Sequence, residues 1–362
     1  MAPACSVKIG CGLLIALFAV AGFAGATPAS SASPQGIAIR PAAAGAYFDH
    51  LVFIIMENKN LADVYGPATY MTQLANEYGI AVEDRYCSVN PSLPNYLCLT
   101  GGSDFGCAGY DGSPDSNACT QAAWVAPNVA DRLETAGLSW KAYMEDMPSP
   151  CYASGDSGLY ILHHDPFLYY RGIATDSTRC NRVVPAGTDA SLLVADLQSA
   201  STAANFMWLS PNNCHNMHSC SVAQGDSFLS NLVPQILGSP VFTTTRAALL
   251  ITFDEDHGGT VYTVWAGAAV KRGFKSSFGY NHFSVLATLE SNWNLSPLTA
   301  NDGDAPSMGE FFTGQADRSG SLPLPPAGSL LILGAAIGVA AIVVAPALLV
   351  LRRSRRRNRP RR

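Results

Sequence analysis

Two uninterrupted apolar runs, at residues 51–56 and 247–253, constrain the fold more than any other feature of this chain. Such runs, rich in Val, Ile and Leu, are typical of strands that are buried on both faces of a parallel sheet. Further strand patterns and helical patterns alternate along the chain. The strand patterns lie at 80–86, 138–144, 205–209 and 261–265. The helical patterns lie at 70–78, 127–136, 189–200, 224–237 and 283–293. The sequence therefore predicts an α/β fold with a mostly parallel central sheet and helices on both faces.

Oxygen-bearing side chains follow both apolar runs directly. Glu57 and Asn58 come after the first run, and Asp254 and Glu255 come after the second. In α/β sheets the reactive groups lie at the carboxyl ends of the strands, and carboxylates that lie close together need protons or a cation. Because oxygen ligands suit a hard or borderline divalent ion, we predict that these four residues bind a divalent metal of unknown identity. The alternative is a pair of unrelated acidic turns.

The two ends of the chain predict export and a membrane anchor. A basic start, a short apolar core and a small-residue cleavage site predict a signal peptide over residues 1–26, with an uncleaved anchor as the alternative. Residues 330–351 carry no charge and are long enough for a transmembrane helix, and the arginines of the tail at 352–362 would stay in the cytoplasm. Between the signal peptide and the membrane helix we expect a flexible lead-in (27–46), the main domain (47–313) and a stalk (314–329). We expect a single-pass protein of the cell membrane with an extracellular domain; a removable sorting-type tail is the runner-up.

The charge of the main part of the chain argues against nucleic acid as a partner. Residues 27–318 contain all 27 acidic residues but only 13 of the 22 basic ones. An acidic surface repels a phosphate backbone, so we expect no nucleic-acid binding.

Eight cysteines remain after the signal peptide, and an even number in an exported chain predicts disulfides. Proximity in the sequence favours three pairs, which are Cys214–Cys220, Cys107–Cys119 and Cys151–Cys180. A zinc site made by Cys214, His215, His218 and Cys220 is the alternative.

Several short motifs resemble those of one known family. The matching stretches are residues 50–58, 92–95 (Ser92-Leu93-Pro94-Asn95), 210–212 with 217–218, 251–256 and 280–284. In this order they resemble the phosphoesterase family of bacterial and archaeal acid phosphatases and phospholipases C, within the alkaline-phosphatase superfamily. No single stretch is specific, but their order along most of the main domain is.

The resemblance implies roles for individual residues. It makes Ser92 the nucleophile, Asn95 a phosphate-contacting amide, and Glu57, Asn58, Asp254 and Glu255 the metal ligands. Superfamily members with two metals use several histidines and aspartates, so the Glu-Asn and Asp-Glu pairs leave the number of metals open. Asn216 stands where an acidic residue is more usual in this family.

Chemical reasoning supports the same site. A serine hydroxyl needs a base or a metal to become a good nucleophile, and a leaving alkoxide needs a proton, which a histidine can supply. We expect His163, His164 and His218 to be catalytic and His282 to bind substrate, with helix capping as the alternative for His282. Ser92 should begin a helix whose unpaired first-turn amides favour a phosphoryl group.

We therefore expect a metal-dependent phosphoester hydrolase that forms a serine phosphoenzyme, most simply an acid phosphatase of small soluble phosphomonoesters. The alternatives are a phospholipase C-type phosphodiesterase acting on phospholipids, and a cell-surface binding domain that has lost catalysis. A sulfatase is disfavoured because the Cys/Ser-x-Pro-x-Arg signature is absent.

Overall fold

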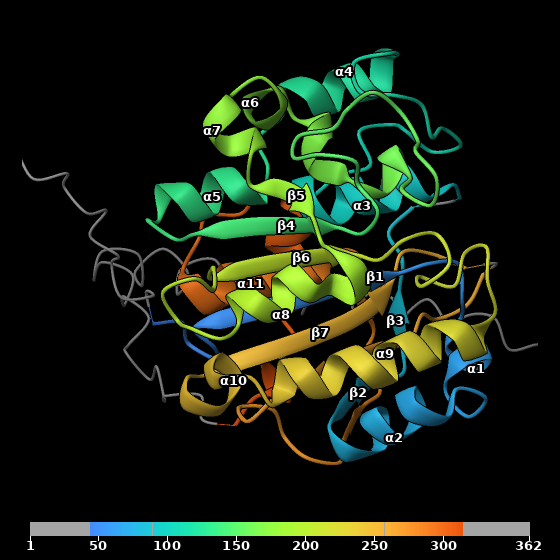
Figure 1. Ribbon diagram of the computed structural model, residues 1–362, viewed down its shortest axis with the longest axis vertical. Coiled ribbons are helices and arrows are strands. Elements are labelled where there is room, and N and C mark those ends of the chain that lie inside the picture. The colour runs from blue at the N-terminus through green and yellow to red at the C-terminus, as the bar shows by residue number, and fades with distance from the viewer. Residues whose placement is uncertain (1–43, 89, 257, 314–362) are drawn as a thin grey trace, which may run out of the picture. The chain divides into compact units, whose positions relative to one another are not determined.

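A computed structural model describes residues 44–313 except 89 and 257 (Figure 1). The strands are β1 (His50–Met56), β2 (Gly79–Ala81), β3 (Asp84–Arg85), β4 (Trp140–Met144), β5 (Val183–Pro185), β6 (Phe206–Ser210), β7 (Ala247–Phe253), β8 (Thr263–Ala266), β9 (Phe274–Ser276) and β10 (Tyr280–Asn281). The α-helices are α1 (Leu61–Val64), α2 (Thr69–Glu77), α3 (Ser92–Gly101), α4 (Ala118–Val125), α5 (Val129–Thr135), α6 (Arg171–Ala174), α7 (Ser177–Cys180), α8 (Ser191–Asp196), α9 (Val222–Leu237), α10 (Pro240–Thr244), α11 (His282–Trp293) and α12 (Ala300–Asp304). Short 3₁₀ helices are η1 (Leu162–His164), η2 (Pro166–Tyr169), η3 (Thr188–Ala190) and η4 (Gly309–Phe311).

Eight strands form the central sheet in the order β5-β4-β6-β1-β7-β8-β2-β9. Strand β8 runs antiparallel to β7 and β2, and the other neighbours are parallel. The two predicted apolar runs are the adjacent central strands β1 and β7, and both are buried along their whole length. The predicted α/β fold with a mostly parallel sheet is therefore confirmed.

Side chains along each strand point alternately to the two faces of the sheet, and helices cover both faces. In β1, Leu51, Phe53 and Ile55 pack into one core with residues of α3, α5 and α11. Val52, Ile54 and Met56 pack into the other core with residues of α2, α8 and α9. Figure 1 shows α8 and α9 in front of the sheet and α11 behind it.

Three predicted elements differ from the structure. The helix expected at 189–200 divides into η3 and α8, which ends at Asp196. The expected strand at 80–86 divides into β2, in the central sheet, and β3, which pairs only with β10 in a separate two-stranded sheet. The helix expected from Pro127 begins instead at Val129, because the Asn128 side chain accepts a hydrogen bond from Asp131 N and caps the helix.

Four disulfides join neighbouring segments. Three of them are the predicted pairs Cys107–Cys119, Cys151–Cys180 and Cys214–Cys220. The fourth, Cys87–Cys98, ties the segment before α3 to that helix. Because the sulfurs of Cys214 and Cys220 bond to each other, the zinc alternative is wrong.

The predicted membrane helix and single-pass location need correction. Within 44–88, 90–256 and 258–313, no helix is both long enough and apolar enough to cross a bilayer. The stretch that suggested one, 330–351, lies outside the described residues, as do the predicted signal peptide, stalk and tail.

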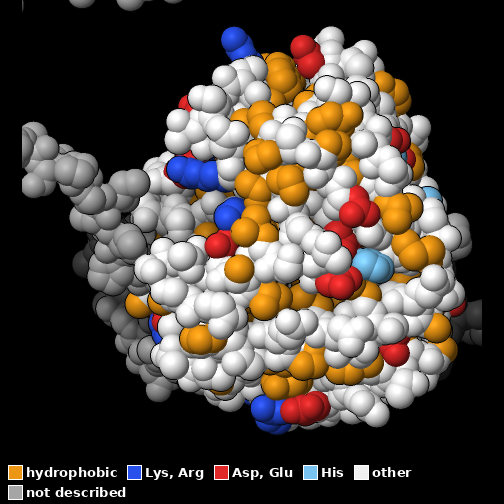
Figure 2. Space-filling view, viewed as in Figure 1, with side chains coloured by type: hydrophobic (Ala, Val, Ile, Leu, Met, Phe, Trp, Pro, Cys, Tyr) orange, Lys and Arg blue, Asp and Glu red, His pale blue; other side chains and the backbone are white. Residues whose placement is uncertain are grey.

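On the face seen in Figure 2, Lys and Arg side chains are few and scattered, in keeping with the acidic balance of the domain.

Candidate active site

The carboxyl ends of β1 and β7 bring two predicted ligand pairs together. Met56 and Phe253 are register partners in the parallel ladder, so Glu57 and Asp254 follow side by side. Asp254 N donates to Met56 O at 2.9 Å, and Asn58 N donates to Asp254 Oδ1 at 3.0 Å. Almost 200 residues of sequence separate these pairs, and the strand register alone aligns them.

Three carboxyl groups at this edge are buried together. Glu57 and Asp254 are 0% exposed and Glu255 is 2% exposed. Burial raises the pKa of Glu57 well above its usual range, and the nearby Asp254 raises it further. Burial also raises the pKa of Asp254 to about 6 and that of Glu255 to about 8. Carboxylates this deeply buried need protons or a positive partner to coexist.

A divalent cation fits this group. Asp254 Oδ2 is buried and has no hydrogen-bond partner among the described residues. No Lys or Arg of the described ranges forms an ion pair with Glu57, Asp254 or Glu255. Oxygen donors without a compensating cation are the donor set that hard divalent ions prefer.

Helix α3 brings the predicted nucleophile to the carboxylates. Ser92 is its first residue, is 3% exposed, and donates from Oγ to Glu57 Oε2 at 3.1 Å. Asn95 lies one turn later and donates from Nδ2 to Glu255 Oε2 at 3.0 Å. The spacing of three residues therefore places both side chains on the helix face that meets the acidic group.

One expectation about α3 needs correction. The first-turn amide of Leu93 is not free, because it donates to Asp111 Oδ1 at a distance of 2.8 Å. Asp111 belongs to a loop that follows the helix. The N-cap residue Pro91 contributes no side-chain cap, so Asp111 satisfies this amide instead.

The three predicted catalytic histidines also gather here. His164 is buried, and its Nε2 lies 3.3 Å from Glu57 Oε1. The ring centroids of His163 and His218 lie 4.7 Å and 6.0 Å from that of His164. Burial lowers the pKa of His164 well below its usual value, and the neighbouring His163 and His218 lower it further. Burial and the charges of His163 and Lys59 lower the pKa of His218.

His282 lies behind the site. It is 0% exposed, and its Nε2 lies 3.1 Å from the carbonyl oxygen of Phe253, the residue before Asp254. Burial lowers its pKa to about 4. In this position the ring supports the end of β7. The substrate-binding role predicted for His282 needs a ring that faces the substrate, and this ring is buried instead.

Tyr96 is a member of the site that the sequence reasoning missed. Its hydroxyl donates to Glu57 Oε1, and its ring stacks on His164 with centroids 5.4 Å apart. An aromatic residue four positions after Ser92 on the same helix was the available signal.

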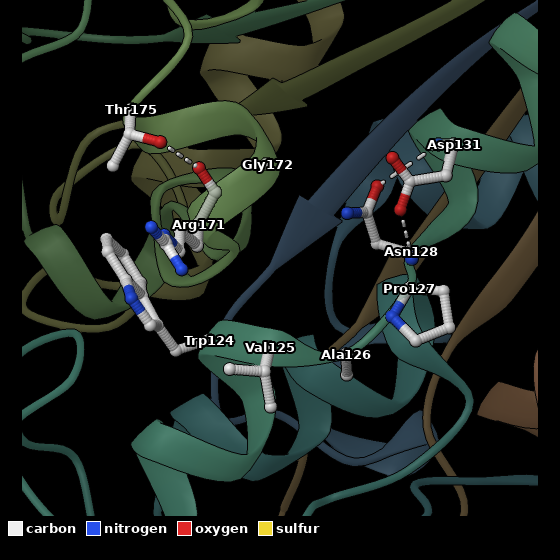
Figure 3. A pocket seen from close by; sticks show the side chains of 9 residues that line it. All are labelled: Trp124, Val125, Ala126, Pro127, Asn128, Asp131, Arg171, Gly172 and Thr175. Carbon is white, nitrogen blue, oxygen red and sulfur yellow. Dashed lines mark hydrogen bonds between the residues drawn. The ribbon is translucent and has the colours of Figure 1, made fainter.

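Two other features lie outside this group. Glu145, Asp189 and His215 form the one trio of His, Cys, Asp or Glu side chains in the described ranges whose ligand atoms all lie within 4.8 Å. His215 Nδ1 lies 2.9 Å from Glu145 Oε2, so these two side chains already pair with each other. A surface pocket of about 530 Å³ between Trp124 and Arg171 contains none of the predicted site residues (Figure 3).

The opposite environments of two histidines give a testable prediction. In metal-free protein His164 should stay neutral at the pH where an ordinary histidine is half protonated, because burial disfavours the charged ring. His215 should protonate at a higher pH than usual, because its hydrogen bond to Glu145 raises its pKa. Imidazole ¹⁵N shifts measured across a pH titration, assigned with His164→Gln and His215→Gln, check both. A His164 that titrates at or above the usual pKa would contradict this geometry.

Comparison with known proteins gives the family. A model of the Phosphoesterase family matches residues 65–276, which is more than half of the chain. A phosphatidylinositol-3-phosphatase of Mycobacterium tuberculosis is 27% identical over 270 residues, covering 73% of this chain and 83% of that protein. A phosphate-repressible acid phosphatase of Penicillium chrysogenum is 27% identical over 269 residues, and an acid phosphatase of Aspergillus fumigatus is 25% identical over 268. Each match covers 70% of this chain but only 61% and 57% of the fungal proteins, so the chain spans less than two thirds of their length.

The solved structures agree on the fold. The lipoteichoic acid synthase LtaP of Listeria monocytogenes has a TM-score of 0.50 at 8% identity, with 76% of each chain covered, and this likeness concerns the fold alone. The ordered motifs and the family match lead to the same conclusion. The chain belongs to the Phosphoesterase family, whose members hydrolyse phosphoester bonds.

Proposed function

We propose that this protein is a metal-dependent phosphomonoesterase that acts through a phosphoserine at Ser92. The observation that carries the proposal is the contact between Ser92 Oγ and Glu57 at the edge of a buried acidic group. Glu57, Asn58, Asp254 and Glu255 would hold the divalent ion. When bound, such an ion lowers the cost of ionising the serine and neutralises charge on the phosphoryl group.

The residues of the chain account for the remaining steps. The Ser92 proton already lies in a hydrogen bond to Glu57 Oε2, which is therefore a proton acceptor within reach. Ser92 Oγ attacks phosphorus, the ester P–O bond breaks, and the leaving alkoxide takes a proton. The candidate donors are His163, which is partly exposed, and His218, which is exposed, because both lie beside the buried His164. Water then attacks the phosphorus and the Oγ–P bond breaks. Ser92 Oγ recovers its proton from Glu57, and the histidine that gave a proton to the leaving group takes one from the water.

Asn95 has a positioning part in this scheme. Its Oδ1 accepts from Ser88 N at 3.0 Å while its Nδ2 donates to Glu255, so the amide is fixed on both sides. A fixed amide beside the nucleophile can orient a phosphoryl oxygen, because phosphoryl transfer depends mainly on positioning and charge stabilisation.

The names of the relatives bear on the substrate class. The fungal relatives are named acid phosphatases, which favours small phosphomonoesters. A phosphorylated lipid is the second candidate, and the name of the mycobacterial relative favours it. A binding domain without catalysis is disfavoured, because the nucleophile and all four proposed ligands are present and lie at the same sheet edge.

The metal prediction concerns Asp254. Asp254→Asn should lose bound divalent ion and hydrolysis of a chromogenic phosphomonoester together, because it removes one negative ligand from the buried group. Asp49→Asn is the matched control, since Asp49 lies at the opposite end of β1 and pairs with Arg246 at the surface. Metal content by elemental analysis and the effect of a chelator on phosphomonoester, phosphodiester and phosphatidylinositol phosphate hydrolysis check it. Full metal content in an inactive Asp254→Asn protein would show that the ligands lie elsewhere.

The nucleophile prediction concerns Ser92. Ser92→Ala should keep metal and fold but lose at least about 10³-fold in kcat, or roughly 4 kcal/mol of barrier stabilisation. Rapid quench of the wild type should trap an acid-stable phosphoserine at this position. A substantially active variant, or inversion of configuration at a chiral phosphate, would point to direct attack by water.

The third prediction concerns Tyr96. Tyr96→Phe should lower kcat by about 10-fold or more, because Glu57 Oε1 loses a buried donor. Tyr170→Phe is the matched control: it also removes a buried hydroxyl bonded to α3, at Thr100 Oγ1, but it does not touch Glu57. Both variants should lose similar stability in urea unfolding. Equal activity of the two variants would refute a role for the Tyr96 hydroxyl.

A further inference from the structure

Asp111 lies among the proposed catalytic groups, although no step above uses it. One oxygen, Oδ1, accepts from Leu93 N at 2.8 Å, and Leu93 is the neighbour of Ser92. The other oxygen, Oδ2, lies 3.7 Å from His163 Nε2. The Asp111 charge also raises the pKa of His218 and of Glu255, so this carboxylate lies near both.

The Leu93 amide is a group that a phosphoryl oxygen on Ser92 would also use. It belongs to the first turn of α3, where N–H groups have no partner within the helix and the helix dipole favours an anion. Ser92 is the first residue of α3 and donates to Glu57, a member of the buried acidic group in which Asp254 Oδ2 has no hydrogen-bond partner among the described residues. The helix start therefore belongs to the reaction site. A carboxylate oxygen on this amide therefore occupies an acceptor position that a phosphoryl oxygen needs.

The loop that carries Asp111 is tied at two points, and the Asp111 side chain is partly exposed. The Cys107–Cys119 disulfide closes the loop, and Tyr169 Oη donates to Gly112 O at 2.9 Å. The Asp111 side chain is 28% exposed, whereas Glu57 and Asp254 are completely buried. Rotation of the Asp111 side chain toward solvent would free the amide without moving the loop backbone.

We propose that Asp111 is an internal competitor of the phosphoryl group: its carboxylate holds the Leu93 amide in the free protein and is displaced when a phosphate-bearing ligand binds. This proposal rests on the proposed function. Displacement has a cost, because a hydrogen bond to a charged acceptor is lost and two anions are brought close together. Asp111 therefore lowers the affinity for the substrate and for the product phosphate, which favours product release.

The test measures the affinity for inorganic phosphate. Asp111→Asn keeps an oxygen that can accept from Leu93 N but removes the charge, and Asp115→Asn is the matched control. Asp115 lies in the same loop, is exposed, and has a φ of 53°, a conformation that Asn also adopts readily. Phosphate affinity is measured by calorimetry on the metal-loaded protein and as an inhibition constant against a chromogenic phosphomonoester. Both measurements are made at neutral pH.

Asp111→Asn should bind phosphate at least about 10-fold more tightly than the wild type, and Asp115→Asn should stay within about 2-fold. Unchanged or weaker binding by Asp111→Asn, in a wild type that binds phosphate and hydrolyses the ester, would overturn the competitor role alone. Such a result would make Asp111 a helix cap or a partner of His163. A wild type that neither binds phosphate nor hydrolyses the ester would overturn the proposed function, and the competitor role with it.

Discussion

The parallel pairing of β1 with β7 is the constraint on which the rest of this site depends. Seven consecutive residue pairs, from His50 with Ala247 to Met56 with Phe253, are in register along the two strands. This ladder places Glu57 and Asp254 next to each other at the carboxyl edge. A shift of one residue would turn every side chain of a strand to the opposite face, where it would have to pack in the other core. The packing of the two cores therefore holds the register and thereby the acidic group.

The acidic group in turn explains the residues packed around it. Buried carboxyl groups are unstable as an unpaired set, and the structure partly compensates them with Ser92, Tyr96 and Asn95, which donate from one face of α3. Asp254 Oδ2 remains without a partner among the described residues. A bound cation would compensate a carboxylate oxygen of this kind. The nucleophile, its nearest proton acceptor and the proposed cation site therefore share one buried network.

The parts predicted from sequence were those with a local signal. Continuous apolar runs identify β1 and β7, and the Ser92-Leu93-Pro94-Asn95 stretch predicts the helix that begins at Ser92. The missed features depend on contacts that no periodicity encodes. The Asp111–Leu93 bond joins a loop to a helix start, and the Tyr96 hydroxyl meets Glu57 only after α3 packs on the sheet. Likewise, the apolar pattern at 80–86 could not show that β2 and β3 join different sheets.

Anomalous diffraction can show where a divalent ion binds in this protein. Crystals grown with Mn²⁺ and measured for anomalous scattering would locate it without any assumption about activity. If the ion binds at the proposed site, we expect a peak at the ends of β1 and β7, within about 2.0–2.6 Å of carboxylate oxygens of Glu57 and Asp254, and next to Ser92 Oγ. A peak only at Glu145, Asp189 and His215, or no peak in a protein that hydrolyses phosphoesters, would contradict the proposed site.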